Sequence, residues 1–218
     1  MAHQTVFTTL LIDQGNLRCL GMHILRIHQT ANLLHIPFPQ WQDHFLKRFL
    51  NNYTIEKGQW RLKIFLNEDN YSFELDPYTH NAIDGYRLCI HPEKIKKKPL
   101  KTQPYEREFI FQRALKLGYD EALTLSRESY VLETAYANFF WRHNNRLFTP
   151  SPELPLLYGI TIQNIKEKIS HVVVKLDDIP QEANLYLCNS LRGIQAIISI
   201  ENKQFPRDFA FEKKFSYM

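Results

Sequence analysis

Cysteine is scarce in this chain of 218 residues, which contains only Cys19, Cys89 and Cys188. An odd number of widely separated cysteines among apolar neighbours favours reduced thiols in the core over a disulfide framework. Histidine and cysteine never occur at the spacing of a metal site, so we expect no bound metal. These scarcities argue against a disulfide-stapled secreted domain and against a structural metal module.

Long hydrophobic runs are also missing. No apolar stretch approaches the roughly 18 residues that cross a bilayer, so we expect no membrane partner. The first residues, MAHQTVFTTLLIDQ, lack the basic start and long apolar stretch of a secretion signal, which predicts a cytoplasmic protein. Internal repeats and low-complexity segments are absent as well.

The composition is that of an ordinary globular protein, with 44% hydrophobic and 23% charged residues and a net charge of +4. Such a chain can bury a sizeable core, as one large domain or two small ones. Much of the positive charge lies in PEKIKKKPLK, residues 92–101. The run Lys94 to Lys98 is either a solvated face or a source of positive potential for an anionic substrate. Interleaved aromatic residues are missing, so we expect no nucleic-acid partner.

The first part of the chain predicts two hairpins and two helices. Turn residues at 14–16 and at 68–70 separate alternating segments typical of paired strands. Apolar residues recur at three- and four-residue steps over 22–36, which predicts a helix closed by Pro37, and a second helix is expected at 41–51. The linker-like composition of 76–85 marks a boundary, which divides the chain into domains 1–80 and 81–218.

The second part predicts short strands with scattered helices. Strands are expected at 86–92, 121–126, 129–133, 138–143, 146–150, 171–176, 184–189 and 194–200. A helix is expected over 105–118, with Gly118 at its C-terminal cap, and another over 160–169. Strands and helices do not alternate regularly, so we expect an α+β fold rather than a doubly wound sheet.

Two charged residues stand out by their surroundings. Glu133 lies in VLETAYANFFW, among apolar neighbours, and is either exposed at a strand end or buried beside a cation, because an unpaired buried carboxylate would take up a proton. Lys101 follows Pro99-Leu100 at the end of an extended segment. It is either an ordinary exposed lysine or a residue with a special role.

Three further places could bind an anion. Arg26 shares a helix face with His23 and makes either surface salt bridges or an anion contact. The segment LLYGIT reaches Gly159 and then enters a helix, so its first amides point toward whatever lies before them, although a glycine at a helix start is commonly structural. CNSLRG, residues 188–193, ends a strand in a turn of small and hydrogen-bonding residues.

Together these motifs resemble the class IV aminotransferase family, the fold-type IV enzymes that use pyridoxal phosphate. The similarity runs from FTT at 7–9 and HILR at 23–26 through Lys101 and RLFTP to IQAI at 194–197. Its most specific part is the pattern E-x-x-x-x-N-x-F at Glu133, Asn138 and Phe140. The resemblance implies a D-amino acid aminotransferase-like fold, with a small N-terminal α/β domain and a larger C-terminal domain that has a barrel-like sheet and carries the cofactor lysine.

The resemblance also implies a role for each matching residue. Lys101 would bind the cofactor aldehyde and later move the proton at the substrate carbon. Glu133 would pair with the protonated pyridine nitrogen, and Tyr105 would lie beside the phenolic oxygen. The phosphate would be held by a group of residues that resemble the family's cup: Arg26, Ile160, Thr161, Asn189 and Ser190.

Within the family, N-S-L-R-G, FTT and ANFFW are similar to 4-amino-4-deoxychorismate lyases, which release pyruvate and form 4-aminobenzoate for folate synthesis. This implies a small anionic amino substrate, and Arg192 would either attract it or make a structural turn contact. The alternatives are an aminotransferase acting on a small branched-chain or D-amino acid, and a non-catalytic protein that keeps the fold. Family members form dimers, so the resemblance implies a homodimer.

Three features depart from the family pattern. Only six residues precede Phe7, where members generally have about twenty more. Ile162 stands at the position of a usual arginine, and Pro104 at that of a common asparagine. These departures concern the substrate pocket more than the cofactor site.

Overall fold

The computed structural model describes residues 5–37, 57–67, 70–79, 83–103, 105 and 107–215. Contacts between Cα atoms divide the chain into unit 1, Met1–Asn81 with Leu100–Tyr105, and unit 2, Ala82–Pro99 with Glu106–Met218. The helix expected at 41–51, the turn residues 68–69 and Pro104 lie outside the described residues.

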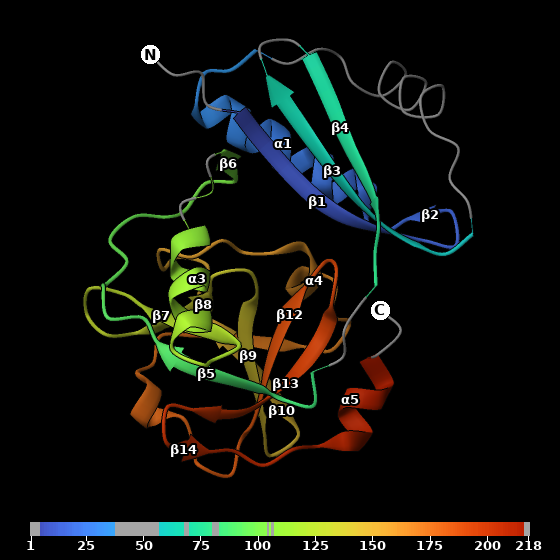
Figure 1. The fold of residues 1–218 in the computed structure, drawn as a ribbon. Helices are drawn as coiled ribbons and strands as arrows, with labels where there is room; N and C mark the ends of the chain where they lie inside the picture. The colour runs from blue at the N-terminus through green and yellow to red at the C-terminus, as the bar shows by residue number, and fades with distance from the viewer. Residues whose placement is uncertain are drawn as a thin grey trace. The chain divides into compact units, whose positions relative to one another are not determined.

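Unit 1 contains an antiparallel sheet whose described part has five strands, in the order β2-β1-β3-β4, with β6 also paired to β1 (Figure 1). The strands are β1 Thr5–Asp13, β2 Asn16–Leu17, β3 Gln59–Asn67, β4 Asn70–Pro77 and β6 Thr102–Gln103. Both predicted hairpins are confirmed. Between β1 and β2 the backbone of Gln14 and Gly15 has φ of 49° and 81°, as a two-residue hairpin turn with a right-handed twist requires.

Helix α1, Leu20–Leu33, packs on this sheet and confirms the helix predicted from the apolar period. Ile24, Ile27 and Ala31 are fully or almost fully buried and belong to one core cluster with Val6 and Leu10 of β1. Each isoleucine, valine or leucine of this cluster contributes about 1.5–3 kcal/mol on burial, and Ala31 contributes less. The helix thereby holds its polar neighbours at fixed positions relative to the sheet.

Unit 2 contains a sheet whose described part has nine strands, in the order β11-β10-β9-β12-β13-β5-β7-β8, with β14 paired to β13. Pairing of Glu133 on β8 with Asn138 on β9 closes this sheet into a barrel, which confirms the predicted barrel-like sheet. The strands are β5 Tyr86–Ile90, β7 Glu121–Leu125, β8 Val131–Thr134, β9 Asn138–His143, β10 Arg146–Pro150, β11 Ile169–Val172, β12 Asn184–Asn189, β13 Gly193–Ile200 and β14 Lys203–Gln204.

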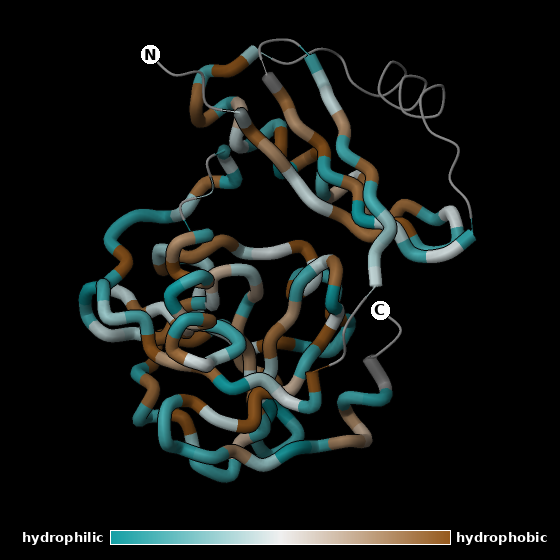
Figure 2. The backbone as a smooth tube through the Cα atoms, in the orientation of Figure 1, coloured by the Kyte–Doolittle hydropathy of each residue, from teal (hydrophilic) through white to brown (hydrophobic). Residues whose placement is uncertain are grey.

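The helical segments of unit 2 are short: α3 Glu108–Lys116, α4 Ile160–Gln163, the 3-10 turn η1 Leu176–Asp178 and α5 Phe209–Phe215. The cap expected at Gly118 is confirmed, because Gly118 follows α3 with φ of 80°. The barrel core is formed by large apolar side chains such as Tyr86 and Phe139. The turn at β14 is hydrophilic in Figure 2, in agreement with the exposure of its residues.

Two expectations need correction here, and two further elements were missed. The helix predicted over 160–169 was wrong beyond Gln163, because the Asn164 side chain caps the Ile160 carbonyl at 3.1 Å and the chain leaves to pair as β11. Cys19 is exposed at the start of α1, whereas Cys89 and Cys188 are buried as expected. Strand β14 and helix α5 were not predicted.

The segment around Lys101 groups with unit 1, whereas the sequence-based division placed it in the C-terminal part. Thr102 and Gln103 pair with Val6 and Thr5, and the Phe7 amide donates to the Lys101 carbonyl at 2.8 Å. These backbone bonds hold the lysine against the edge of β1. Among the described residues no helix is long and apolar enough to span a bilayer.

Candidate active site

Thr8, His23 and Arg26 form a polar cluster on the helix-covered face of the unit 1 sheet. Thr8 lies on the same face of β1 as Val6 and Leu10, and it is fully buried in that otherwise apolar row. Its hydroxyl accepts a hydrogen bond from Arg26 Nη2 at 2.6 Å and lies 2.7 Å from His23 Nδ1. The half-buried guanidinium is therefore held by β1 as well as by its own helix.

The surroundings of His23 favour its neutral form. Burial lowers its pKa well below 6.5, and the positive charges of Arg26 and Lys101 lower it further. A neutral imidazole can accept a hydrogen bond from the Thr8 hydroxyl at Nδ1, and the hydroxyl oxygen can at the same time accept one from Arg26. Its other nitrogen, Nε2, is buried without a hydrogen-bond partner among the described residues.

The ammonium of Lys101 lies over two aromatic rings. Its Nζ is 4.1 Å from the ring centroid of Tyr105 and 4.9 Å from that of Phe7. The two rings meet edge to face, with centroids 5.6 Å apart. Such faces attract a cation and restrict the lysine side chain. Lys101 therefore differs from the exposed Lys96, Lys97 and Lys98 of the preceding run.

In unit 2 the buried interpretation of Glu133 is confirmed. Glu133 is only 5% exposed, and its Oε1 lies 3.0 Å from Arg107 Nη2. The backbone amide of Leu157 donates to the same oxygen at 2.6 Å, and Asn138 Nδ2 lies 3.3 Å from Oε2. Arg107 in turn donates to the Thr134 carbonyl at 3.1 Å. A cation and several donors thus compensate for the desolvation of this carboxylate.

Asn138 joins Glu133 to the segment that precedes α4. Its Nδ2 donates to the Leu157 carbonyl at 2.7 Å, and its Oδ1 accepts from the Gly159 amide at 3.0 Å. A Cβ at Gly159 would lie 2.1 Å from that same Oδ1, so only glycine permits this approach. The glycine of LLYGIT therefore has a close-packing reason, and it brings the start of α4 next to the Glu133 strand.

The other expected cup residues lie at two turns of unit 2. Ile160 and Thr161 occupy the first turn of α4, where backbone amides have no partner within the helix. Ser190 is half-buried in the turn between β12 and β13. Asn189 shapes this turn, because its Oδ1 accepts from the amides of Leu191 and Arg192 at 3.0 and 2.8 Å.

The side chains of Arg192 and Ile162 both make structural contacts within unit 2. The Arg192 guanidinium pairs with the buried carboxylate of Glu121 at 3.2 Å and retains 25% exposure. Its structural contact is thus present, and its substrate role stays a prediction. Ile162 is a core residue in the cluster that includes Phe140 and Tyr186.

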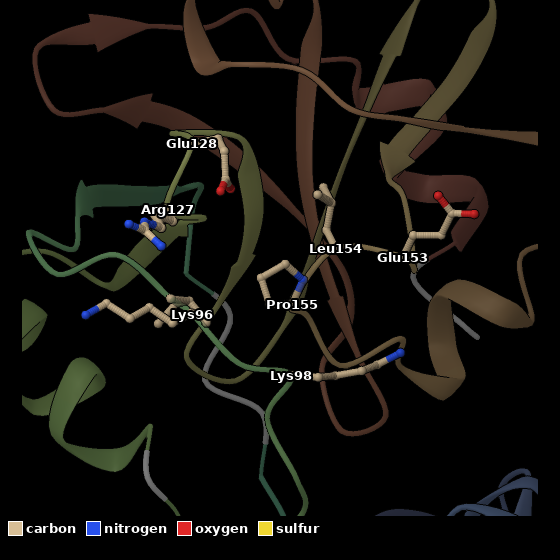
Figure 3. Close-up of a pocket in the computed structure, with 8 residues that line it drawn as sticks. Lys96, Lys98, Arg127, Glu128, Glu153, Leu154 and Pro155 are labelled. Atoms are coloured by element: carbon tan, nitrogen blue, oxygen red, sulfur yellow. The ribbon is translucent and has the colours of Figure 1, made fainter.

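A pocket of about 440 Å³ lies elsewhere in unit 2, where the basic run meets two turns. Figure 3 shows Lys96 and Arg127 extending on one side of Pro155, and Lys98 and Glu153 on the other. Lys98 Nζ donates to the Pro152 carbonyl at 3.2 Å. Carboxylates of Glu153 and Glu128 also line the pocket and offset much of its positive charge.

The structure brings the predicted residues together in two sets, one in each unit. Arg26, Lys101 and Tyr105 belong to unit 1, and the remaining residues to unit 2. Sequence reasoning missed Thr8, His23, Arg107 and Glu121 as partners. Thr8 in an apolar row and His23 in H-x-x-R carried a signal, whereas nothing in the sequence marked Arg107. No cluster of three or more possible metal ligands occurs among the described residues.

The chain combines a strand-closed barrel that holds a buried glutamate with a second unit, a helix-covered sheet that carries the lysine, and these are the two parts of the fold-type IV aminotransferase fold. The model of the family "Amino-transferase class IV" matches residues 5–200. The chain therefore belongs to the class IV aminotransferase family, whose members are enzymes.

Similar proteins span nearly the whole chain. The aminodeoxychorismate lyase of Vibrio harveyi is 23% identical over 95% of this chain and 87% of its own length. The putative 4-amino-4-deoxychorismate lyase of Legionella pneumophila has a TM-score of 0.83 at 24% identity, covering 97% and 88% of the two chains. A pyridoxal-phosphate-bound hypothetical aminotransferase of Mycobacterium tuberculosis has a TM-score of 0.81 at 19% identity, covering 96% and 85%.

Proposed function

We propose that this protein is a pyridoxal-phosphate-dependent lyase that converts 4-amino-4-deoxychorismate into 4-aminobenzoate and pyruvate. Membership of the class IV family supports the cofactor. The similarity to the Vibrio harveyi aminodeoxychorismate lyase along 95% of the chain supports the reaction, together with the N-S-L-R-G turn.

The environment of Glu133 is the observation that carries the cofactor proposal. A carboxylate kept 5% exposed beside Arg107 is a charge-stabilising group in a desolvated place, where a cationic ring nitrogen would be a suitable partner. Position 159 accepts only glycine, and Gly159 places the first amides of α4 next to this strand. The residues therefore fit a group with a basic ring nitrogen at one end and a phosphate at the other.

The residues of the proposed site divide into groups with different tasks. Arg26, Ile160, Thr161, Asn189 and Ser190 would hold the phosphate, whose charge matches a guanidinium and the positive end of a helix turn. Glu133 would keep the ring nitrogen protonated. When bound, pyridoxal phosphate supplies a ring that accepts the electron pair released at the substrate carbon.

Lys101 would act as the covalent anchor of the cofactor and as the proton carrier. In the lyase reaction it would take the proton from the ring carbon that bears the substrate's amino group. The bond between the adjacent carbon of the substrate ring and the enolpyruvyl oxygen then breaks. The substrate ring becomes aromatic, and the released enol gains a proton to give pyruvate. The rings of Tyr105 and Phe7 contact the free Lys101 ammonium and would position it before it reacts.

Product analysis tests this proposal. Purified protein supplied with pyridoxal phosphate and 4-amino-4-deoxychorismate should form 4-aminobenzoate and pyruvate in equal amounts without any amino acceptor. Borohydride reduction should fix the cofactor on the peptide that contains Lys101. Lys101→Ala should abolish both results, whereas Lys98→Ala, which removes an exposed lysine of the same segment, should abolish neither.

The second candidate is an aminotransferase for a small branched-chain or D-amino acid, which the family name itself favours. Such an enzyme would need a 2-oxo acid for turnover and would release no 4-aminobenzoate. Activity only with a donor and an acceptor would overturn the lyase assignment. Cofactor attachment without turnover of either substrate class would support the third reading, a non-catalytic protein that keeps the fold.

We also propose a homodimer, because the resemblance to the family implies one. Sedimentation velocity should give twice the mass of the chain, and a monomer at all concentrations would contradict this.

A further inference from the structure

Glu121 is a fully buried carboxylate outside the set of residues assigned above. It opens β7, is 0% exposed, and its Oε1 lies 3.2 Å from Arg192 Nη1. Burial raises its pKa to about 7, against the opposing effects of Arg192 and of hydrogen bonds from Thr134 and Ala135. Glutamate is rarely buried completely unless it is paired. The complete burial of Glu121 therefore depends on its pairing with Arg192.

The partner of Glu121 belongs to the turn that contains Ser190. The amide of Arg192 donates to Asn189 Oδ1 at 2.8 Å, while its guanidinium reaches Glu121 and lies 5.7 Å from the Tyr86 ring centroid. One residue of the turn is thus fixed by its main chain at one end and by its side chain at the other. A three-residue turn fixed in this way has little freedom left.

The same turn is tied to the bend that follows Glu133. Asn189 Nδ2 donates to the Tyr136 carbonyl at 3.1 Å, and Glu121 opens β7, which pairs with β8. Two side chains therefore connect the β12–β13 turn to the end of β8. A shift of the turn would have to break an ion pair as well as a hydrogen bond.

We propose that Glu121 is a positioning residue, which holds the Ser190–Arg192 turn through Arg192 so that Ser190 meets the cofactor phosphate. The inference rests on the proposed function, because it assigns the turn to phosphate binding. It also assigns Arg192 to the turn contact, one of the two roles that the sequence left open.

The experiment compares two ligands that differ only in the phosphate. Dissociation constants of pyridoxal phosphate and of pyridoxal are measured by absorbance titration for the wild type, Glu121→Gln and Arg192→Met. Each variant should weaken pyridoxal phosphate about tenfold, the effect of one charge-assisted hydrogen bond, and leave pyridoxal unchanged. The double variant should be no weaker than either single one, because the two residues act as one unit.

The Arg207–Glu212 pair supplies a matched control. Its atoms lie 2.6 Å apart on the segment around α5, and Glu212→Gln should leave the ratio of the two dissociation constants unchanged. Equal weakening of both ligands by Glu121→Gln, or no weakening, would overturn the inference alone. Arg192→Met gives the same decision should Glu121→Gln not fold. A wild type that binds neither ligand would instead overturn the proposed function, and this inference with it.

Discussion

Replacing Glu133 by glutamine separates the structural role of this residue from its chemical role. Glutamine keeps the size of the side chain and can still accept from the Leu157 amide, which donates to Glu133 at 2.6 Å. It removes the charge beside Arg107, whose side chain is only 4% exposed. Removing one member of a buried ion pair leaves an uncompensated charge and costs about 3–5 kcal/mol. For a chain of this size that corresponds to a fall in Tm of roughly 6–20 °C.

Turnover should fall as well as stability. Without a carboxylate at the ring nitrogen, the cofactor loses its stabilised positive charge, and we expect a rate about 10²–10³-fold lower with the cofactor still attached at Lys101. Adding Arg107→Met to Glu133→Gln removes the uncompensated cation and should restore most of the Tm, but none of the turnover. Calorimetry and product assays on the single and double variants check both expectations. Near-normal turnover in Glu133→Gln, or recovery of turnover in the double variant, would refute this reasoning.

Three further predictions concern single contacts. Gly159→Ala should lower the free energy of unfolding by about 1–3 kcal/mol and weaken cofactor binding, because the new Cβ would lie 2.1 Å from Asn138 Oδ1. A Cβ at Gly21 would meet nothing within 4 Å, so Gly21→Ala should not destabilise the fold in parallel denaturant titrations. The pKa of His23 in the folded protein lies below its unfolded value of 6.5, so its contribution to stability is present above pH 6.5 and is lost as the pH falls below 6.5, by up to ~1.4 kcal/mol per pH unit. Between pH 6.5 and lower pH, the free energy of unfolding of His23→Gln should therefore fall less than that of the wild type. An equal fall would contradict this role of His23. Tyr105→Phe keeps the aromatic ring next to the Lys101 ammonium, so it should lower the free energy of unfolding less than Tyr105→Leu does; equal losses in denaturant titrations would show that the ring face does not matter.

The local elements were largely predictable because their signals are local. The period of Ile24, Ile27 and Ala31 predicts a buried helix face, and the turn residues Gln14 and Gly15 predict a tight hairpin. The helix expected over 160–169 failed for a reason of tertiary origin, since pairing of β11 with β10 takes the chain away after Gln163.

Motifs in the amino-acid sequence were enough to identify the residues that can perform the chemistry, namely a lysine at position 101, a carboxylate at 133 and the small turns at 159 and 190. Order and spacing along the chain were sufficient for that, because the family's motifs are short and keep a fixed order. The residues that compensate for the buried charges became apparent only from the folded chain. Arg107 reaches Glu133 across 26 positions, and Arg192 reaches Glu121 across 71, as β-strand pairing brings distant segments together. Long-range pairs of this kind leave no periodic trace, so partners could be assigned only from the folded chain.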